Sequence, residues 1–276
     1  MAGYTRSSRV VGKAGEERRL IMVQLVSDTW YLFNKYLRIT LRMPMWALFT
    51  IVQPLIWLLI FGQLFKNMAS LPGFPEGRYM DFFLPGAIIM TVLFGTSWSG
   101  VSLLREINFG TVEKMMVTPV SRVAIVMSRV IHTAVTVIVQ CLIIIIIAII
   151  FGATVSGIKG VLLSLVIVFL LSLGFSGISN GLAMWLKREE PLVMLGNMMT
   201  LPLMFLSSAM VPKSFMPEWI RVITKINPID YAVEATRAFY SGGASLNAAL
   251  VGFLFLSLFA AGSISWATEM FMNQSE

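Results

Sequence analysis

Long blocks of apolar residues, separated by short polar segments, dominate the pattern along this chain. The blocks cover residues 45–65, 83–104, 123–151, 161–186, 192–211 and 247–271. A helix rises 1.5 Å per residue, so about 20 apolar residues cross the ~30 Å hydrocarbon core of a bilayer. Each block reaches that length. The pattern therefore predicts an all-α polytopic membrane protein with six transmembrane helices in residues 44–276.

Residues 16–43 precede the first block and show helical periodicity with two unlike faces. One face carries the apolar residues Val23, Val26, Trp30, Phe33, Leu37 and Leu41. Another face carries the polar residues Gln24, Asp28, Lys35, Arg38 and Arg42. An amphipathic helix of this kind lies in the membrane interface. Residues 1–15 are small, polar and basic, which predicts a disordered cytoplasmic tail.

Residues 211–243, between the fifth and sixth blocks, are predicted to form two short helices. The first begins at Pro217, and the second follows Asn227–Pro228 and ends at Gly242. Aromatic residues suited to the headgroup level are Trp219, Tyr231 and Tyr240. Because neither helix is long or apolar enough to span a bilayer, the segment is interpreted as a re-entrant helical hairpin on the outer face.

Basic residues predict the orientation of the chain. The formal net charge is +7, and with the N-terminus inside, 14 of the 21 Lys and Arg residues lie in cytoplasmic segments. Positive residues favour the cytoplasmic side, and an even number of spans returns the chain to it. Both termini are therefore expected in the cytoplasm. The charge is explained by this asymmetry, so we expect no binding to nucleic acid.

The cytoplasmic loop at residues 105–122 is the longest polar segment between two blocks on the inner side. Thr111 is predicted to cap a short helix that Pro119 ends. Glu113 suits the positive end of the helix dipole, and Met115 and Met116 add flexible apolar surface for a partner. On physical grounds alone, an ordinary interfacial loop explains this stretch equally well.

Composition and motifs exclude several kinds of protein. The chain is 57% hydrophobic and 13% charged, with a mean hydropathy of +0.81, whereas soluble domains carry about 25% charged residues. No G-x-x-x-x-G-K-[ST] motif is present to bind ATP. One histidine and one cysteine make a His/Cys zinc site improbable, and no metal site is expected. The spans carry no central Asp or Glu of the kind that ion-coupled carriers use.

A few polar or small residues inside the blocks have simple structural explanations. Arg129 is expected to extend toward the cytoplasmic interface, and His132 is expected to be neutral and bonded to a neighbouring helix. Cys141 lies in an apolar run and is interpreted as a packing residue. The small residues Gly174, Gly177 and Gly181 allow close helix packing, within one protomer or at a dimer seam.

Two motifs in these segments resemble the ABC-2 family of exporter permeases, especially members similar to the daunorubicin-resistance and nodulation-factor permeases. The residues of the outer segment that match are Pro212, Pro217, Trp219, Asn227, Pro228, Tyr231, Glu234 and Arg237. Those of the cytoplasmic loop are Glu106, Gly110, Thr111, Glu113, Thr118 and Pro119. The resemblance implies that the loop couples the chain to an ATPase, for which Met115 and Met116 are the predicted apolar contacts. The pattern of the outer residues predicts a gate over the translocation route, with simple anchoring at the interface as the alternative.

The resemblance also implies partners and a location. It implies a second permease protomer, identical or different, and two copies of a separate ABC ATPase that carry ATP and Mg²⁺, while this chain itself has no cofactor and is not an enzyme. The expected location is the inner membrane of a prokaryote, in contact with lipid. The expected cargo is an amphipathic drug, a lipid or a lipid-linked glycan. The alternatives are an ion-coupled secondary transporter and a membrane-embedded lipid-modifying enzyme.

Overall fold

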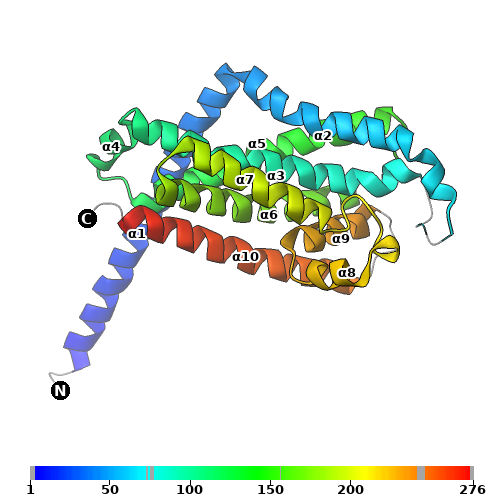
Figure 1. Cartoon of the computed structure of the whole chain (residues 1–276). Coiled ribbons are helices and arrows are strands. Elements are labelled where there is room, and N and C mark those ends of the chain that lie inside the picture. Colours follow the sequence, from blue (N-terminus) through cyan, green and yellow to red (C-terminus); the bar gives the residue numbers. More distant parts are fainter. Residues whose placement is uncertain (1–3, 73, 75–77, 156, 241–245, 274–276) are drawn as a thin grey trace.

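The chain is an elongated helical bundle in the computed structural model, which describes residues 4–72, 74, 78–155, 157–240 and 246–273 (Figure 1). The α-helices are α1 (Tyr4–Arg42), α2 (Pro44–Leu64), α3 (Tyr79–Asn108), α4 (Thr111–Met116), α5 (Arg122–Ile150), α6 (Gly157–Leu186), α7 (Glu189–Phe205), α8 (Glu218–Thr224), α9 (Pro228–Tyr240) and α10 (Leu246–Asn273). Two short 3-10 helices are η1 (Lys66–Ser70) and η2 (Lys213–Phe215). No strand occurs in these ranges, and the predicted all-α fold is confirmed.

The long helices α2, α3, α5, α6, α7 and α10 run along the bundle in alternating directions (Figure 1). Contacts between distant segments define its two ends. At one end, which we call the α4 end, Arg105 Nε at the close of α3 lies 3.1 Å from Glu189 Oε2 at the start of α7. At the other, the α8 end, Arg78 Nη1 before α3 donates to the carbonyl of Gly152 after α5, at 2.8 Å. The C-terminal end of α10 lies near α4 (Figure 1).

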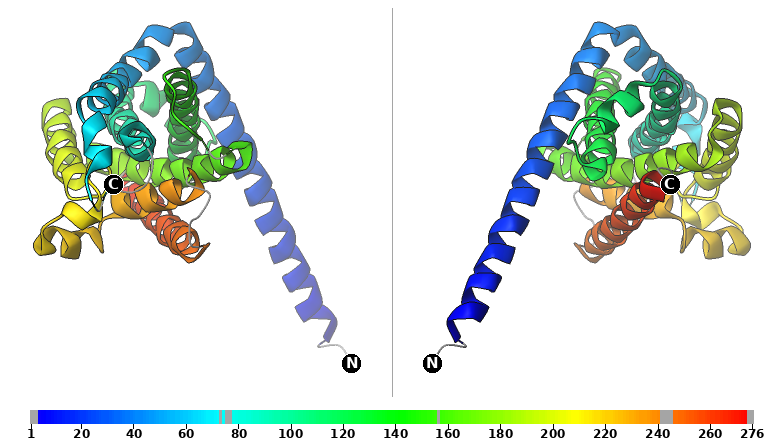
Figure 2. Two further views of the ribbon diagram at one scale, coloured as in Figure 1. Left: turned by 90° about the vertical axis from the view of Figure 1, so that its right-hand side faces the viewer. Right: turned by 90° about the vertical axis from the view of Figure 1, so that its left-hand side faces the viewer.

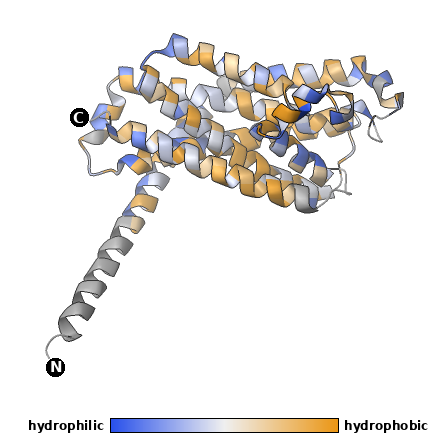
Figure 3. Cartoon of the chain, turned by 60° about the horizontal axis from the view of Figure 1, so that its bottom comes forward, coloured by the Kyte–Doolittle hydropathy of each residue, from blue (hydrophilic) through white to orange (hydrophobic). Residues whose placement is uncertain are grey.

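Within the described residues, four helices are long and apolar enough to cross a membrane: α3, α5, α6 and the Ala249–Asn273 part of α10. A shorter apolar stretch covers Phe49–Leu64 of α2. Helix α7 has 17 residues and spans only about 26 Å at 1.5 Å per residue. Hydrophobic residues run along these helices, and hydrophilic residues gather toward the two ends (Figure 3).

The predicted fifth span, residues 192–211, was wrong in its end, because α7 stops at Phe205. The last carbonyl groups of a helix need partners from outside it. Here the side-chain amide of Asn227 donates to the carbonyls of Leu203, at 2.7 Å, and Leu206, at 2.9 Å. A distant residue therefore ends this helix well before the apolar run ends.

Helices α6 and α10 pack closely through the glycines of α6. A Cβ atom on Gly174 would lie 2.4 Å from the ring of Phe259, and one on Gly177 would lie 3.0 Å from the backbone of Ser263. The third glycine of the series, Gly181, faces the ring of Trp266 in the same way. The glycine series thus packs against α10 within this chain.

Helix α1 diverges from the bundle toward the N-terminus (Figure 2). It begins at Tyr4, and residues 1–3 lie outside the described part, while the disordered tail predicted for residues 1–15 stays a prediction. Phe33 and Tyr36 are buried where α1 packs on α5. The apolar side chains left more than 60% exposed include Val23, Val26, Trp30 and Leu41.

Candidate functional sites

A short loop containing α4 joins α3 to α5 at the α4 end. Gly110 occupies the N-cap position of α4 with φ 65°, a left-handed conformation that favours glycine. Thr111 is the first helical residue, and no side chain caps α4. The prediction that Thr111 caps this helix was therefore wrong, because glycine makes the turn by its backbone. The helix ends at Met116, before Pro119, and Thr118 Oγ1 donates to the carbonyl of Met115 at 2.5 Å.

Helix α1 holds the second half of this loop. Gln24 Nε2 donates to the carbonyl of Pro119 at 3.3 Å, and the backbone N–H of Ser121 donates to Asp28 Oδ2 at 3.4 Å. Lys35 Nζ lies 4.0 Å from Met115 Sδ. The polar face of α1 thus contacts the loop, which its amphipathic pattern alone does not reveal.

A buried ion pair joins the end of α3, directly before the loop, to α5. Arg129 Nη1, on α5, lies 2.6 Å from Glu106 Oε2, on α3. The hydroxyl of Tyr36 donates to the same carboxylate at 3.2 Å and accepts from Arg129 Nη1 at 3.2 Å. Arg129 is 4% exposed. Arg129 therefore does not extend to the exposed surface as expected, because it bonds to a carboxylate inside the bundle.

The exposed surface of the loop differs from the predicted one. Glu113 is exposed, but Met115 packs partly against the bundle, and the side chain of Met116 lies outside the described part. The apolar side chains that face outward are Phe109, 79% exposed, and Val117, 88% exposed. The sequence analysis missed both. Phe109 stands alone between polar or small residues, which was an available signal, whereas Val117 directly follows Met115 and Met116 and does not stand out.

Two residues inside α5 have the packing roles predicted for them. His132 Nε2 lies 2.9 Å from the hydroxyl of Thr40 on α1, so the imidazole bonds to a neighbouring helix. Cys141 is buried, with its sulfur 3.8 Å from the carbonyl of Ile88 on α3. Neither belongs to the candidate sites at the two ends.

The two short helices of the α8 end agree with the sequence pattern. Pro217 is the N-cap of α8, and Pro228 is the first residue of α9. Asn227 Oδ1 accepts from the backbone N–H of Ile229 at 3.0 Å, so Asn227 caps α9 while its amide group ends α7. The predicted end of the second helix at Gly242 lies outside the described residues, which give α9 up to Tyr240.

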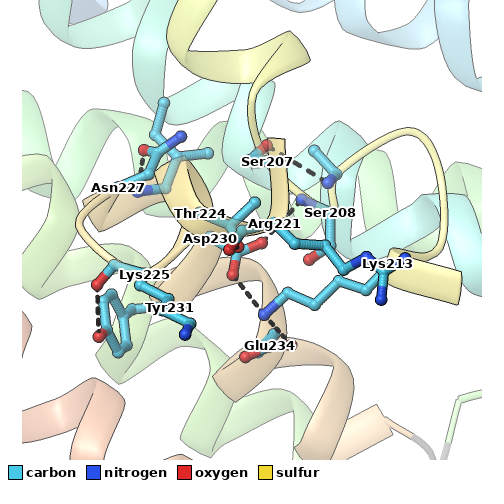
Figure 4. Close-up of polar contacts among 12 residues, drawn as sticks. Ser207, Ser208, Lys213, Arg221, Thr224, Lys225, Asn227, Asp230, Tyr231 and Glu234 are labelled. Carbon is cyan, nitrogen blue, oxygen red and sulfur yellow. Dashed lines mark hydrogen bonds and ion pairs between the residues drawn. The ribbon is translucent and has the colours of Figure 1, made fainter. Parts of the chain in front are cut away.

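A three-residue ion cluster joins η2 to α9 (Figure 4). Lys213 Nζ lies 2.6 Å from Asp230 Oδ2 and 2.6 Å from Glu234 Oε1. Asp230, which is 2% exposed, also accepts from the backbone N–H of Ser208 at 2.7 Å. Burial lowers the pKa of Lys213, but its hydrogen bonds to the two carboxylates outweigh burial and raise the pKa overall. Lys213 is therefore charged at neutral pH.

The other predicted gate residues divide into two groups. Arg237 lies beside the cluster, since its Nη2 donates to the carbonyl of Ser208 at 2.8 Å and its guanidinium lies 4.0 Å from the ring centroid of Phe82. Tyr231 points elsewhere, with its hydroxyl donating to the carbonyl of Lys225 at 2.8 Å, and Trp219 is 62% exposed. Sequence reasoning missed Lys213 and Asp230. The i, i+4 spacing of Asp230 and Glu234 was the available signal.

An elongated bundle with apolar helices along its length and polar networks at both ends defines a polytopic membrane protein. Residues 27–241 match the family model described as ABC-2 type transporter, and the chain belongs to this family. It is 32% identical to the transport permease ycf38 of Cyanophora paradoxa, over 72% of this chain and 69% of that protein.

Relatives named for drug resistance match over a similar length. The chain is 24% identical to the daunorubicin resistance ABC transporter permease protein DrrB1 of Streptomyces coeruleorubidus, over 73% of this chain and 70% of that protein. It is 23% identical to the doxorubicin resistance ABC transporter permease protein DrrC of Mycobacterium tuberculosis, over 83% of this chain and 81% of that protein. Its class is therefore that of membrane-embedded transport permeases.

Proposed function

We propose that this chain is the membrane-spanning permease subunit of an ATP-driven exporter whose ATPase is a separate polypeptide. The observation that carries the proposal is the loop at the α4 end, which is exposed on its outer side and firmly bonded to α1, α3 and α5 on its inner side. A surface of this kind suits the transmission of a partner's motion. The sequence contains no P-loop of its own, so the energy of ATP must come from a partner.

The docking surface for the ATPase consists, in this proposal, of Phe109, Glu113 and Val117. Exposed apolar side chains beside a charge are typical anchors of protein interfaces. Thr111, Thr118 and Pro119 shape the loop that presents them. Glu106 serves a different role, because it faces inward to Arg129 and is the joint between the loop and the bundle.

The hairpin of residues 211–243 is, in this proposal, an outer lid over the export route. The Lys213 cluster ties the segment between α7 and α9 to α9 itself. Asn227 and Arg237 bond to backbone carbonyls at the end of α7 and just after it, which holds the hairpin to the bundle. A lid must be rigid in its closed state, and buried polar networks supply such rigidity.

The proposed topology has six spans, with α2 and α7 completing the set, and both termini in the cytoplasm. Two such protomers, identical or different, and two ATPases make the exporter, in the inner membrane of a prokaryote. The cargo is an amphipathic drug, a lipid or a lipid-linked glycan, which is consistent with the names of the drug-resistance relatives.

Co-purification with a candidate ABC ATPase, followed by transport in inverted vesicles, tests the proposal. We expect a stable complex, ATP hydrolysis stimulated by amphipathic compounds, and ATP-dependent uptake into the vesicles. An ATPase variant that lacks the P-loop lysine is the control and should remove uptake without loss of the complex. Uptake driven by a proton or sodium gradient without ATP would contradict the proposal and favour an ion-coupled secondary transporter.

A further inference from the structure

A cavity of about 230 Å³ lies among α1, α2, α3 and α5, next to the buried ion pair. Apolar side chains such as Ile39 and Val137 form part of its wall, and the polar groups in it are Thr40, Ser102, Arg129, His132, Thr133 and Thr136 among others. Polar groups are costly in a helical bundle unless they are bonded, and in membrane proteins they often mark a pathway. The cavity lies in the half of the bundle nearer the α4 end.

A second cavity of about 180 Å³ adjoins the first and has a different character. Its wall consists of Phe49, Thr50, Gln53, Phe94 and Trp98. Thr50 and Trp98 line both cavities, so the two spaces meet along α2 and α3. The result is one groove that is polar beside Arg129 and aromatic beside Phe49 and Phe94.

The charges of the groove are already matched. Arg129 Nη1 is bonded to Glu106 at 2.6 Å, so neither group offers a net charge to a ligand. An anion would compete with Glu106, and a cation would compete with Arg129, each at the cost of leaving a buried charge without its partner. The polar groups left for a ligand are uncharged, and they include the hydroxyls of Ser102, Thr133 and Thr136. They suit a neutral hydroxyl or carbonyl group.

We propose that this groove binds the uncharged head group of a single-chain or small amphiphile taken from the leaflet on the α4 side. A hydroxyl or carbonyl group of the head occupies the polar cavity, and the apolar body lies along Phe49, Phe94 and Trp98. The cavity is smaller than most drug sites, which selects a compact head. The inference rests on the proposed function, since the groove is the loading site of that exporter.

Photolabelling of the purified permease in nanodiscs tests the proposal without ATPase or ATP. Three photoactivatable probes share one acyl or alkyl chain and differ in the head: a monoacylglycerol, an alkyl phosphate and a quaternary alkylammonium. We expect saturable labelling of peptides that contain Phe49, Phe94 or Trp98 by the monoacylglycerol. The two charged probes should label these peptides about tenfold less, because burying an unmatched charge is costly.

Thr136→Phe fills the polar cavity and should lower labelling by about tenfold. Val139→Phe is the matched control, because Val139 lies on the same helix and is 52% exposed. It should leave labelling unchanged. Labelling that does not saturate, that survives Thr136→Phe or that favours a charged probe overturns the proposal. No step of the labelling uses ATP, so the two proposals can fail separately. Absent labelling with intact ATP-dependent export would refute only the binding groove, and specific labelling without ATP-dependent export would refute only the exporter function.

Discussion

Arg129 Nη1 lies 2.6 Å from Glu106 Oε2, which joins α5 to the last part of α3 directly before the exposed loop. Tyr36 of α1 bonds to both partners, so three helices meet at one buried charge pair. Such a pair is a weak source of net stability, but removal of one partner leaves the other buried and uncompensated. The joint is therefore sensitive to any change that separates loop and bundle.

The first prediction concerns this pair. Glu106→Ala should destabilise the purified protein by about 3–5 kcal/mol, because it leaves the Arg129 charge buried. The double variant Glu106→Leu/Arg129→Met should recover most of the loss. Thermal unfolding in detergent measures both. Glu113→Ala, at an exposed position of the same loop, is the control and should change stability by less than about 0.5 kcal/mol. Equal stability of Glu106→Ala and wild type would contradict the role of the Glu106–Arg129 pair in holding α3 to α5.

The second prediction concerns topology. Single cysteines at Leu71 and Ile226, both exposed at the α8 end, should react with a membrane-impermeant maleimide in intact cells. A cysteine at Val117, which is 88% exposed, should react only after permeabilisation. The single cysteines are introduced into the Cys141→Ser variant, and this substitution should be tolerated because it is small and Cys141 is a buried packing residue. Labelling of position 117 in intact cells would reverse the proposed orientation.

The third prediction concerns the docking surface. Phe109→Ala/Val117→Ala should weaken co-purification with the ATPase by at least about tenfold, because truncated anchors commonly cost about 1–2 kcal/mol each. Glu113→Lys should weaken it more than Glu113→Gln, since it reverses the charge. Met115→Ala should have a smaller effect, because Met115 is partly packed against the bundle.

The control for this docking surface is Ile158→Ala, an apolar residue 80% exposed at the other end. It should leave assembly unchanged. Equal assembly in the double variant and in Ile158→Ala would mean that the ATPase binds elsewhere.

The fourth prediction concerns the outer cluster. Lys213→Met leaves the buried Asp230 without its cation and should loosen the lid, which lowers export several-fold while assembly with the ATPase persists. Lys213→Arg should restore part of the activity. Vesicle uptake and co-purification are measured side by side. Lys225→Met, at an exposed lysine nearby, should behave like wild type, and unchanged export in Lys213→Met would refute the lid.

The fifth prediction is the pH dependence of the same cluster. The folded-state pKa of Lys213 is raised above its ordinary value of 10.5. A raised pKa gives stability that is fully present below the ordinary value and lost as the pH rises through the folded-state value. The difference in unfolding temperature between wild type and Lys213→Met should therefore be constant from neutral to mildly alkaline pH and shrink in strong alkali. A difference that disappears near pH 7 would contradict the cluster.

Local sequence patterns predicted most of the long helices. The apolar blocks predicted α2, α3, α5, α6 and α10 within a few residues, because a helix in lipid satisfies its backbone within its own segment. The break at Asn227–Pro228 was equally readable, since proline ends or begins a helix by its own geometry. These features depend on neighbours in the sequence and on the length of an apolar run.

The contacts that define the candidate sites depend on tertiary structure. The end of α7 was misplaced because its cap, Asn227, comes from a distant segment, and Phe109 and Val117 were missed because exposure depends on what the rest of the bundle covers. The sequence by itself determined which segments are helices. Only the tertiary structure decided that Glu106 faces Arg129 and that Lys213 faces Asp230, because a charge finds its partner through helix packing, which residue spacing along one chain does not encode.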